Sequence, residues 1–144
     1  MLQLLCFSYF ASDTQVIQKM RVLLIDERQS PFSTHLARAI RYQNVRQQMW
    51  WVQRSADVTS LSPEVLEFPP DLIIVVNDET EPALRRILTA LQENTRTISR
   101  PVLVVNACPL SDELLSDFSV QIKATFVTPF SIEEFLTTLQ QFTS

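Results

Sequence analysis

The sequence contains no glycine in its 144 residues, although average usage is about 7%. Phosphate-binding loops and dinucleotide fingerprints depend on glycine, because a residue without a Cβ lets the backbone approach phosphate closely. Neither kind of nucleotide site can be built here in its usual form. This absence is the strongest exclusion that the composition gives.

Cysteine and histidine are also scarce. The chain has two cysteines, Cys6 and Cys108, and one histidine, His35. Two thiols make no disulfide framework, and no zinc or acyl-transfer group of cysteine and histidine can be assembled from these residues. We expect two buried thiols in a reducing compartment and a surface position for His35.

Concentrated positive charge and long apolar runs are missing as well. The twelve basic residues are scattered and the net charge is -4, so we expect no nucleic-acid binding by this domain alone. The apolar run that opens the chain is too short to span a bilayer, and it lacks a basic start and a small-residue cleavage site. We therefore expect a cytoplasmic protein without a membrane contact.

The apolar content of 46% is enough for a buried core, and the length fits one domain. Met20 stands directly before the first strand-like run. We predict an N-terminal apolar extension over residues 1–19 and one domain over residues 20–144. The extension must cover either its own domain or a neighbour, and a second copy of the chain is one such neighbour.

Five apolar or β-branched runs predict strands, and helical patterns alternate with them. The predicted strands are 21–26, 48–53, 71–76, 101–106 and 123–127, and the predicted helices are 30–43, 62–68, 82–92, 111–118 and 131–142. This alternation predicts an α/β three-layer sandwich, a five-stranded parallel sheet with about five helices. The flavodoxin-like order 2-1-3-4-5 is favoured, with its crevice at the carboxyl ends of strands 1 and 3.

Helical spacing also predicts which side chains face the core. In the first helix we expect an apolar face of Phe32, Leu36, Ala39 and Ile40. In the last helix we expect a buried stripe that runs from Ile132 through Phe135 and Leu136 to Leu139.

Four short motifs end four of the predicted strands. They are LLIDE with Asp26 and Glu27, PDLIIVV with Val76, VVNA with Asn106, and VTPF with Thr128. In this order and spacing, from about Met20 to Ser144, the chain resembles the receiver domain of two-component response regulators. The resemblance implies a magnesium-binding acidic pair, a phosphoacceptor aspartate, a threonine or serine, and a lysine at these four places.

Three of the four chemical positions are altered. Phosphoryl transfer to an aspartate needs a carboxylate nucleophile, a metal and groups that hold the phosphoryl oxygens. Val76 has no nucleophile, Thr128 has no charge, and Asn106 cannot rotate inward as a small hydroxyl does. We therefore predict a pseudo-receiver that is not an enzyme and has no cofactor.

The acidic residues leave alternatives open. Asp26 and Glu27 are either solvated loop acids or a vestigial site that binds Mg²⁺ weakly. Asp78 follows the third strand by two residues and is an alternative, shifted phosphoacceptor. That shift breaks the spacing of the motifs and still provides no lysine.

The resemblance implies a regulatory module that binds partner proteins without phosphorylation, in signal transduction or transcriptional control. The aromatic switch of ordinary receivers falls here on Thr125, with Phe126 beside it. The candidate interaction residues are Thr125, Phe126, Trp50, Trp51, Phe7 and Phe10. The alternative is a small-molecule sensor or vestigial ligand-binding domain that uses the crevice near Asp26, Glu27, Asn77 and Asn106.

Overall fold

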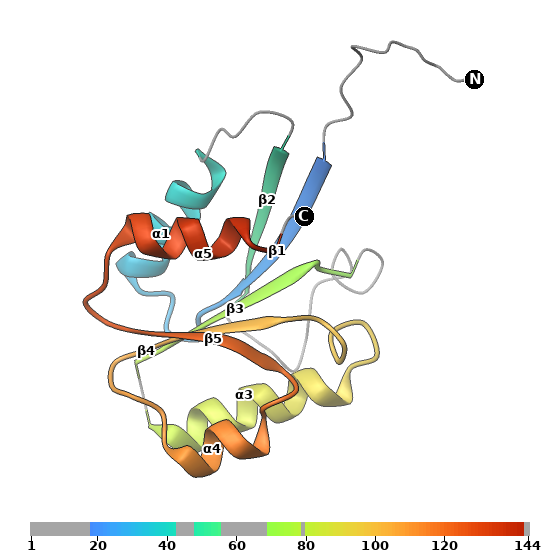
Figure 1. Cartoon of the computed structure of the whole chain (residues 1–144), viewed down its shortest axis with the longest axis vertical. Coiled ribbons are helices and arrows are strands. Elements are labelled where there is room, and N and C mark those ends of the chain that lie inside the picture. The colour runs from blue at the N-terminus through green and yellow to red at the C-terminus, as the bar shows by residue number, and fades with distance from the viewer. Residues whose placement is uncertain (1–17, 43–47, 56–68, 79, 143–144) are drawn as a thin grey trace.

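The computed structural model describes residues 18–42, 48–55, 69–78 and 80–142. Five strands form one parallel sheet in the order β2-β1-β3-β4-β5 (Figure 1). The strands are β1 (Gln18–Ile25), β2 (Gln48–Ser55), β3 (Leu72–Asn77), β4 (Val102–Asn106) and β5 (Ile122–Val127). The predicted α/β architecture and strand order are confirmed, and β1 begins two residues before the expected domain boundary.

Helices cover both faces of the sheet. They are α1 (Pro31–Arg41), α3 (Glu81–Glu93), α4 (Asp112–Asp117) and α5 (Ile132–Gln140). In Figure 1, α1 and α5 lie on one side of the sheet, and α3 and α4 lie on the other. The helix predicted over 62–68 and the residues Cys6, Phe7 and Phe10 lie outside the described ranges.

The central strand β3 is buried along its whole length, which explains its unbroken apolar sequence. Its side chains alternate between two cores, as strand geometry requires. Ile73 and Val75 pack in the core under α3 and α4. Ile74 and Val76 pack in the core under α1 and α5.

Three of these helices begin at a serine whose hydroxyl accepts a backbone N–H, the usual N-cap interaction. The Oγ atoms of Ser30, Ser111 and Ser131 accept from residues three positions on, at 3.3, 3.1 and 3.3 Å. In α5 the donor is the backbone N–H of Glu134. The caps fix where the chain turns from each strand into its helix.

Two predicted helix faces need correction. The α1 helix buries Ser33, Leu36, Ala37 and Ile40, an i, i+3, i+4, i+7 series, so Ala37 replaces Ala39 on the buried face. In α5, Phe135 and Leu139 are buried, whereas Ile132 is 39% exposed. Ile132 lies in the first turn of α5, outside the buried stripe.

The edge strand β5 contains a bulge. Ile122 is the register partner of Val102, but Ala124, and not Lys123, is the partner of Leu103. Ile122 therefore packs on the α3–α4 side, while Ala124 and Phe126 pack on the α1–α5 side. Lys123, Thr125 and Val127 are exposed.

The longest described helix, α3, has 13 residues. A transmembrane helix needs about 20 apolar residues. Within the part of the chain that the structure describes, no helix is long and apolar enough to cross a bilayer.

Candidate functional site

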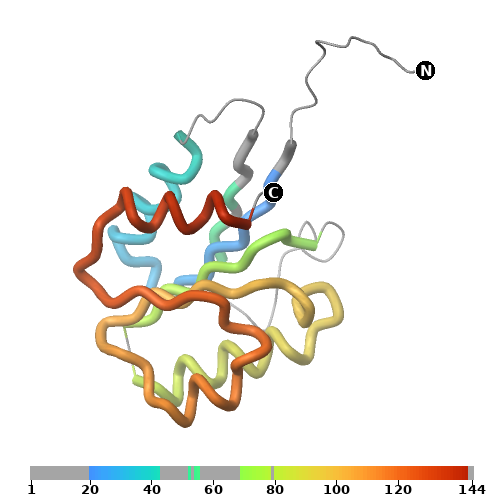
Figure 2. Tube along the Cα trace, in the orientation of Figure 1, coloured from blue at the N-terminus to red at the C-terminus, as the bar shows by residue number. Residues whose placement is uncertain are grey.

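The carboxyl ends of β1, β3 and β4 meet at one edge of the sheet, because these neighbouring strands are parallel. The edge lies on the left of the view in Figure 2. The predicted site residues of the four motifs lie at or directly after these strand ends and that of β5. In an open α/β sheet this edge is the usual place for a ligand crevice.

Asp26 is held by the loop that leads into α1. Its carboxylate accepts hydrogen bonds from the backbone N–H of Arg28 at 3.1 Å, and from the backbone N–H and hydroxyl of Ser30, both at 2.8 Å. The residue is 3% exposed. The Asp26 carboxylate therefore holds in place the loop that leads into α1.

The pKa of Asp26 is lowered from its ordinary value of 3.8. Burial opposes ionisation and raises the pKa, but hydrogen bonds from Ser33, Ser30 and Arg28 outweigh it. Because the Ser33 hydroxyl donates to the Ser30 carbonyl at 3.0 Å, we assign the lowering chiefly to the Ser30 and Arg28 donors. Asp26 is an anion at neutral pH.

The other two acids that the structure describes at this edge each face an arginine. The Glu27 carboxylate accepts a bidentate pair of hydrogen bonds from the guanidinium group of Arg86 on α3, from Nη2 at 2.6 Å and from Nη1 at 3.0 Å. Arg28 and Asp78 form an exposed ion pair, with 3.8 Å between Arg28 Nε and Asp78 Oδ1. A cation at this edge would have to compete with these guanidinium groups.

The amides of Asn77 and Asn106 join the tips of β3 and β4. Asn77 Nδ2 donates to Asn106 Oδ1 at 2.8 Å, and Asn106 Nδ2 donates to the carbonyl of Cys108 at 2.7 Å. Both asparagines are buried. Asn77 was expected only as part of a ligand crevice, and its direct bond to Asn106 was not predicted.

Val76, the predicted phosphoacceptor position, lies in the hydrophobic core under α1 and α5 and is 7% exposed. The neighbouring Asn77 therefore provides the polar side chain at the tip of β3. Thr128 is half-buried, and its backbone N–H donates to the Asn106 carbonyl at 3.0 Å. Val76 and Thr128 bring neither a carboxylate nor a cation to the edge.

Metal ligands do not gather in the described part of this edge. Among the residues that the structure describes, no group of three or more His, Cys, Asp or Glu side chains is placed to hold a metal ion. Asp26 is directed to the α1 loop and Glu27 to Arg86. If Mg²⁺ binds weakly here, these are the two residues that would hold it, after giving up those contacts.

Cys108 follows β4 and is an exposed, free thiol. The expected burial of this cysteine is therefore wrong, because it lies in the loop beyond the buried strand. His35 is exposed on α1, as predicted.

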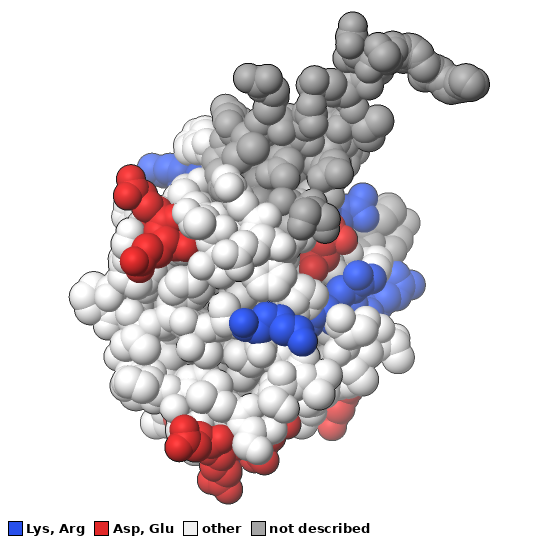
Figure 3. All heavy atoms as spheres, in the orientation of Figure 1, with Lys and Arg blue, Asp and Glu red and all other residues white. Residues whose placement is uncertain are grey.

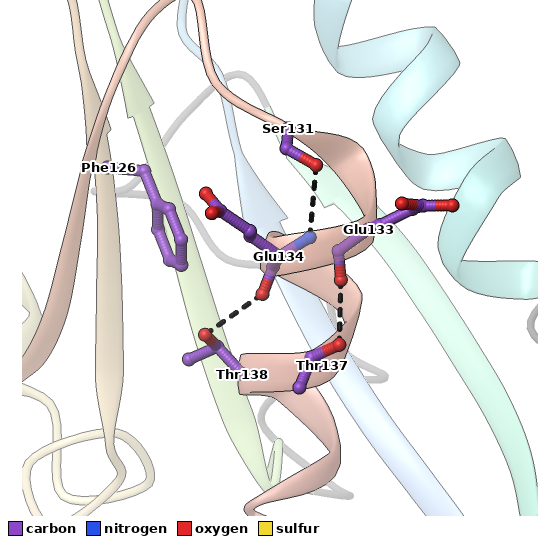
Figure 4. Close-up of a pocket in the computed structure, with 6 residues that line it drawn as sticks. All are labelled: Phe126, Ser131, Glu133, Glu134, Thr137 and Thr138. Carbon is purple, nitrogen blue, oxygen red and sulfur yellow. Dashed lines mark hydrogen bonds between the residues drawn. The ribbon is translucent and has the colours of Figure 1, made fainter.

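A second polar region lies between β5 and α5. Thr125 is exposed and Phe126 is half-buried. The Phe126 ring contacts those of Phe135 and Phe130, with ring centroids 4.9 and 5.3 Å apart. The Phe126 ring lines a groove with five residues of α5 and its cap: Ser131, Glu133, Glu134, Thr137 and Thr138 (Figure 4).

The structure does not bring all predicted interaction residues together. Thr125 and Phe126 are on β5, at one edge of the sheet, whereas Trp50 and Trp51 are in β2 at the other edge. These two pairs cannot belong to one small surface.

Sequence reasoning missed Arg86. It lies 59 residues from Glu27 in the chain, and nothing in the sequence distinguishes it from the other scattered arginines. Glu27 and Arg86 became neighbours only through the order of the strands.

No family model matches the chain, and no curated protein matches it. Solved structures do. The chemotaxis protein CheY4 of Vibrio cholerae is 17% identical, with a TM-score of 0.68 over 86% of this chain and 98% of that chain.

Two further solved structures are similar to the chain to about the same degree. A response regulator from Desulfuromonas acetoxidans is 16% identical, with a TM-score of 0.64 over 85% of this chain and 94% of that one. The non-phosphorylated HemR receiver domain from Leptospira biflexa is 17% identical, with a TM-score of 0.61 over 87% and 94%. The chain has the fold of response-regulator receiver domains.

Proposed function

We propose that this protein is a phosphorylation-independent pseudo-receiver, a regulatory module that acts in signal transduction or transcriptional control by binding a partner protein. The observation that carries the proposal is the tip of β3. Val76 is in the core, and Asn77 is bonded to Asn106. An amide is no nucleophile for phosphoryl transfer.

The surrounding charges support the same proposal. Phosphoryl transfer needs metal-bound carboxylates and a free cation at the phosphoryl oxygens. Here the Asp26 carboxylate is bonded to the loop that leads into α1, and Glu27 and Asp78 form ion pairs with arginines. A receiver fold with this edge keeps its shape and its surface but has lost the groups of the reaction.

Ligand sensing at the same edge ranks second. Asn77 and Asn106, which would have to read a small molecule, already bond to each other and to the backbone. A ligand would have to break these buried hydrogen bonds before it could form its own.

The test is incubation with acetyl phosphate and Mg²⁺, followed by intact-protein mass measurement. We expect no phosphorylated species. A gain of one phosphoryl group that Asp78→Ala abolishes would identify Asp78 as a working phosphoacceptor and would overturn the proposal.

A further inference from the structure

We propose that the groove between β5 and α5 binds an arginine side chain presented by a partner protein. This inference rests on the proposed function, because it names the chemistry of the partner that the module would recognise. It goes beyond it by assigning a site with three side chains: Phe126, Glu134 and Thr138.

The polar groups of the groove are hydrogen-bond acceptors. Thr138 Oγ1 donates its proton to the Glu134 carbonyl at 3.0 Å, and Thr137 Oγ1 donates to the Glu133 carbonyl at 2.8 Å. These hydroxyls therefore present lone pairs to the solvent, as the carboxylates do. A ligand that is rich in donors and positively charged complements such a surface.

The side chains divide into two sides of α5. Figure 4 shows Glu134 extending toward the Phe126 ring, whereas Glu133 extends away from it on the other side of the helix. Phe126, Glu134 and Thr138 thus combine an aromatic ring, a carboxylate and a hydroxyl oxygen. Glu133 and Thr137 also line the groove, but they form the same polar pair away from the ring.

This combination favours arginine over lysine. A guanidinium group is planar, carries five donors in a fixed fork and stacks on aromatic faces. An ammonium group is a compact, strongly hydrated charge that gains less from a ring. The contacts with Phe130 and Phe135 hold the Phe126 ring in position beside the groove.

The charge around the groove agrees with a cationic occupant. Among the described residues, none of the ion pairs involves Glu133 or Glu134. Figure 3 shows acidic side chains together over α5, separated from a second acidic group over α3 and α4 by an uncharged stretch. The carboxylate beside the ring is therefore available to a partner.

The test uses the full chain, labelled with ¹⁵N, and two hexapeptide probes. One probe carries two arginines among alanines, and the other carries two lysines at the same positions. We expect amide shifts centred on Phe126, Glu134 and Thr138, with the arginine peptide binding about threefold more tightly than the lysine peptide.

Two matched variants remove the same charge on the two sides of the helix. Glu134→Gln should weaken arginine-peptide binding about fivefold, and Glu133→Gln less than about twofold. Both residues are exposed, so both variants should fold. Equal losses in the two variants, equal affinity of the two peptides, or shifts centred elsewhere would overturn the arginine site.

This outcome is independent of the phosphorylation test. A chain that takes no phosphoryl group and ignores the arginine peptide overturns the groove assignment alone. A chain that is phosphorylated at Asp78 overturns the proposed function, whether or not the peptide binds.

Discussion

The two polar regions of this molecule differ in how their groups are satisfied. At the carboxyl ends of β1, β3 and β4, the described acids bond to backbone groups or face arginines, and the amides bond to each other. In the groove between β5 and α5, the acids have no described ion-pair partner and the threonine hydroxyls point their lone pairs outward. Recognition needs groups that gain something from a partner. The difference supports our proposal that a partner binds at the groove and that the polar groups at the sheet edge stabilise the fold.

The largest effect expected at the sheet edge comes from placing a carboxylate on β3. Val76→Asp would bury a charge without a partner in the core and should lower the free energy of unfolding by about 3–5 kcal/mol. Asn77→Asp, one residue on, should cost less, about 2 kcal/mol, because the Asn106 amide can turn its Nδ2 donor to the new carboxylate at the expense of its bond to the Cys108 carbonyl. Urea unfolding measures both, and equal costs would contradict our assignment of the strand tip to Asn77.

The next effect comes from the amide pair. Asn106→Ala removes the acceptor of the Asn77 amide and should cost about 1–3 kcal/mol, because a buried donor then lacks its partner. In a double-mutant cycle with Asn77→Ala, the two costs should overlap by at least about 0.5 kcal/mol. Strictly additive costs would mean that the bond between the two amides contributes nothing.

Asp26 should make stability depend on pH. Its folded pKa is lowered, so the stabilisation is complete above the ordinary pKa of 3.8 and is lost as the pH falls through the lower folded value. Asp26→Asn should cost about 1–2 kcal/mol at pH 7, since the neutral amide is a weaker acceptor for the α1 loop. Urea unfolding from pH 7 to pH 3 should show this difference shrinking below about pH 4. A constant difference would show that the charge of Asp26 is not involved.

The smallest effects concern the ion pairs. Glu27→Gln should lower the free energy of unfolding by about 0.5–1 kcal/mol, because the bidentate ion pair with Arg86 is partly exposed. Arg28→Ala should stay within about 0.5 kcal/mol, since that pair is longer and more exposed. High salt should reduce the Glu27 effect. A larger cost for Arg28→Ala would reverse the importance that we give to the two pairs.

The sequence was sufficient for the strands and their order, and the reason is physical. A strand covered on both faces reads as a continuous apolar run, and β3 and β4 are buried at every position. Short connections between alternating strands and helices then leave few topologies. Apolar residues such as Leu72 and Val104 therefore indicate a buried strand without any knowledge of their contacts.

The side-chain contacts of the site could not be predicted in the same way. The bond between Asn77 and Asn106 depends on the register of β3 against β4, and the pair of Glu27 and Arg86 depends on where α3 lies over the sheet. Hydrophobic periodicity also misplaced Ala39 and Ile132, since it gives the direction of a helix face only to within about one residue. Such details require the packed structure.

The bulge at Lys123 decides which way the end of β5 faces. Strand side chains have a period of two, so one extra residue inverts the whole segment that follows it. Deleting Lys123 would remove the bulge but leave Ala124 opposite Leu103 and Phe126 opposite Val105, so the ring would keep its contacts with Phe130 and Phe135. The side of the sheet that carries this aromatic ring is thus set by the parity of a residue count, and it would be reversed if Lys123 entered the ladder opposite Leu103 and shifted every later residue by one.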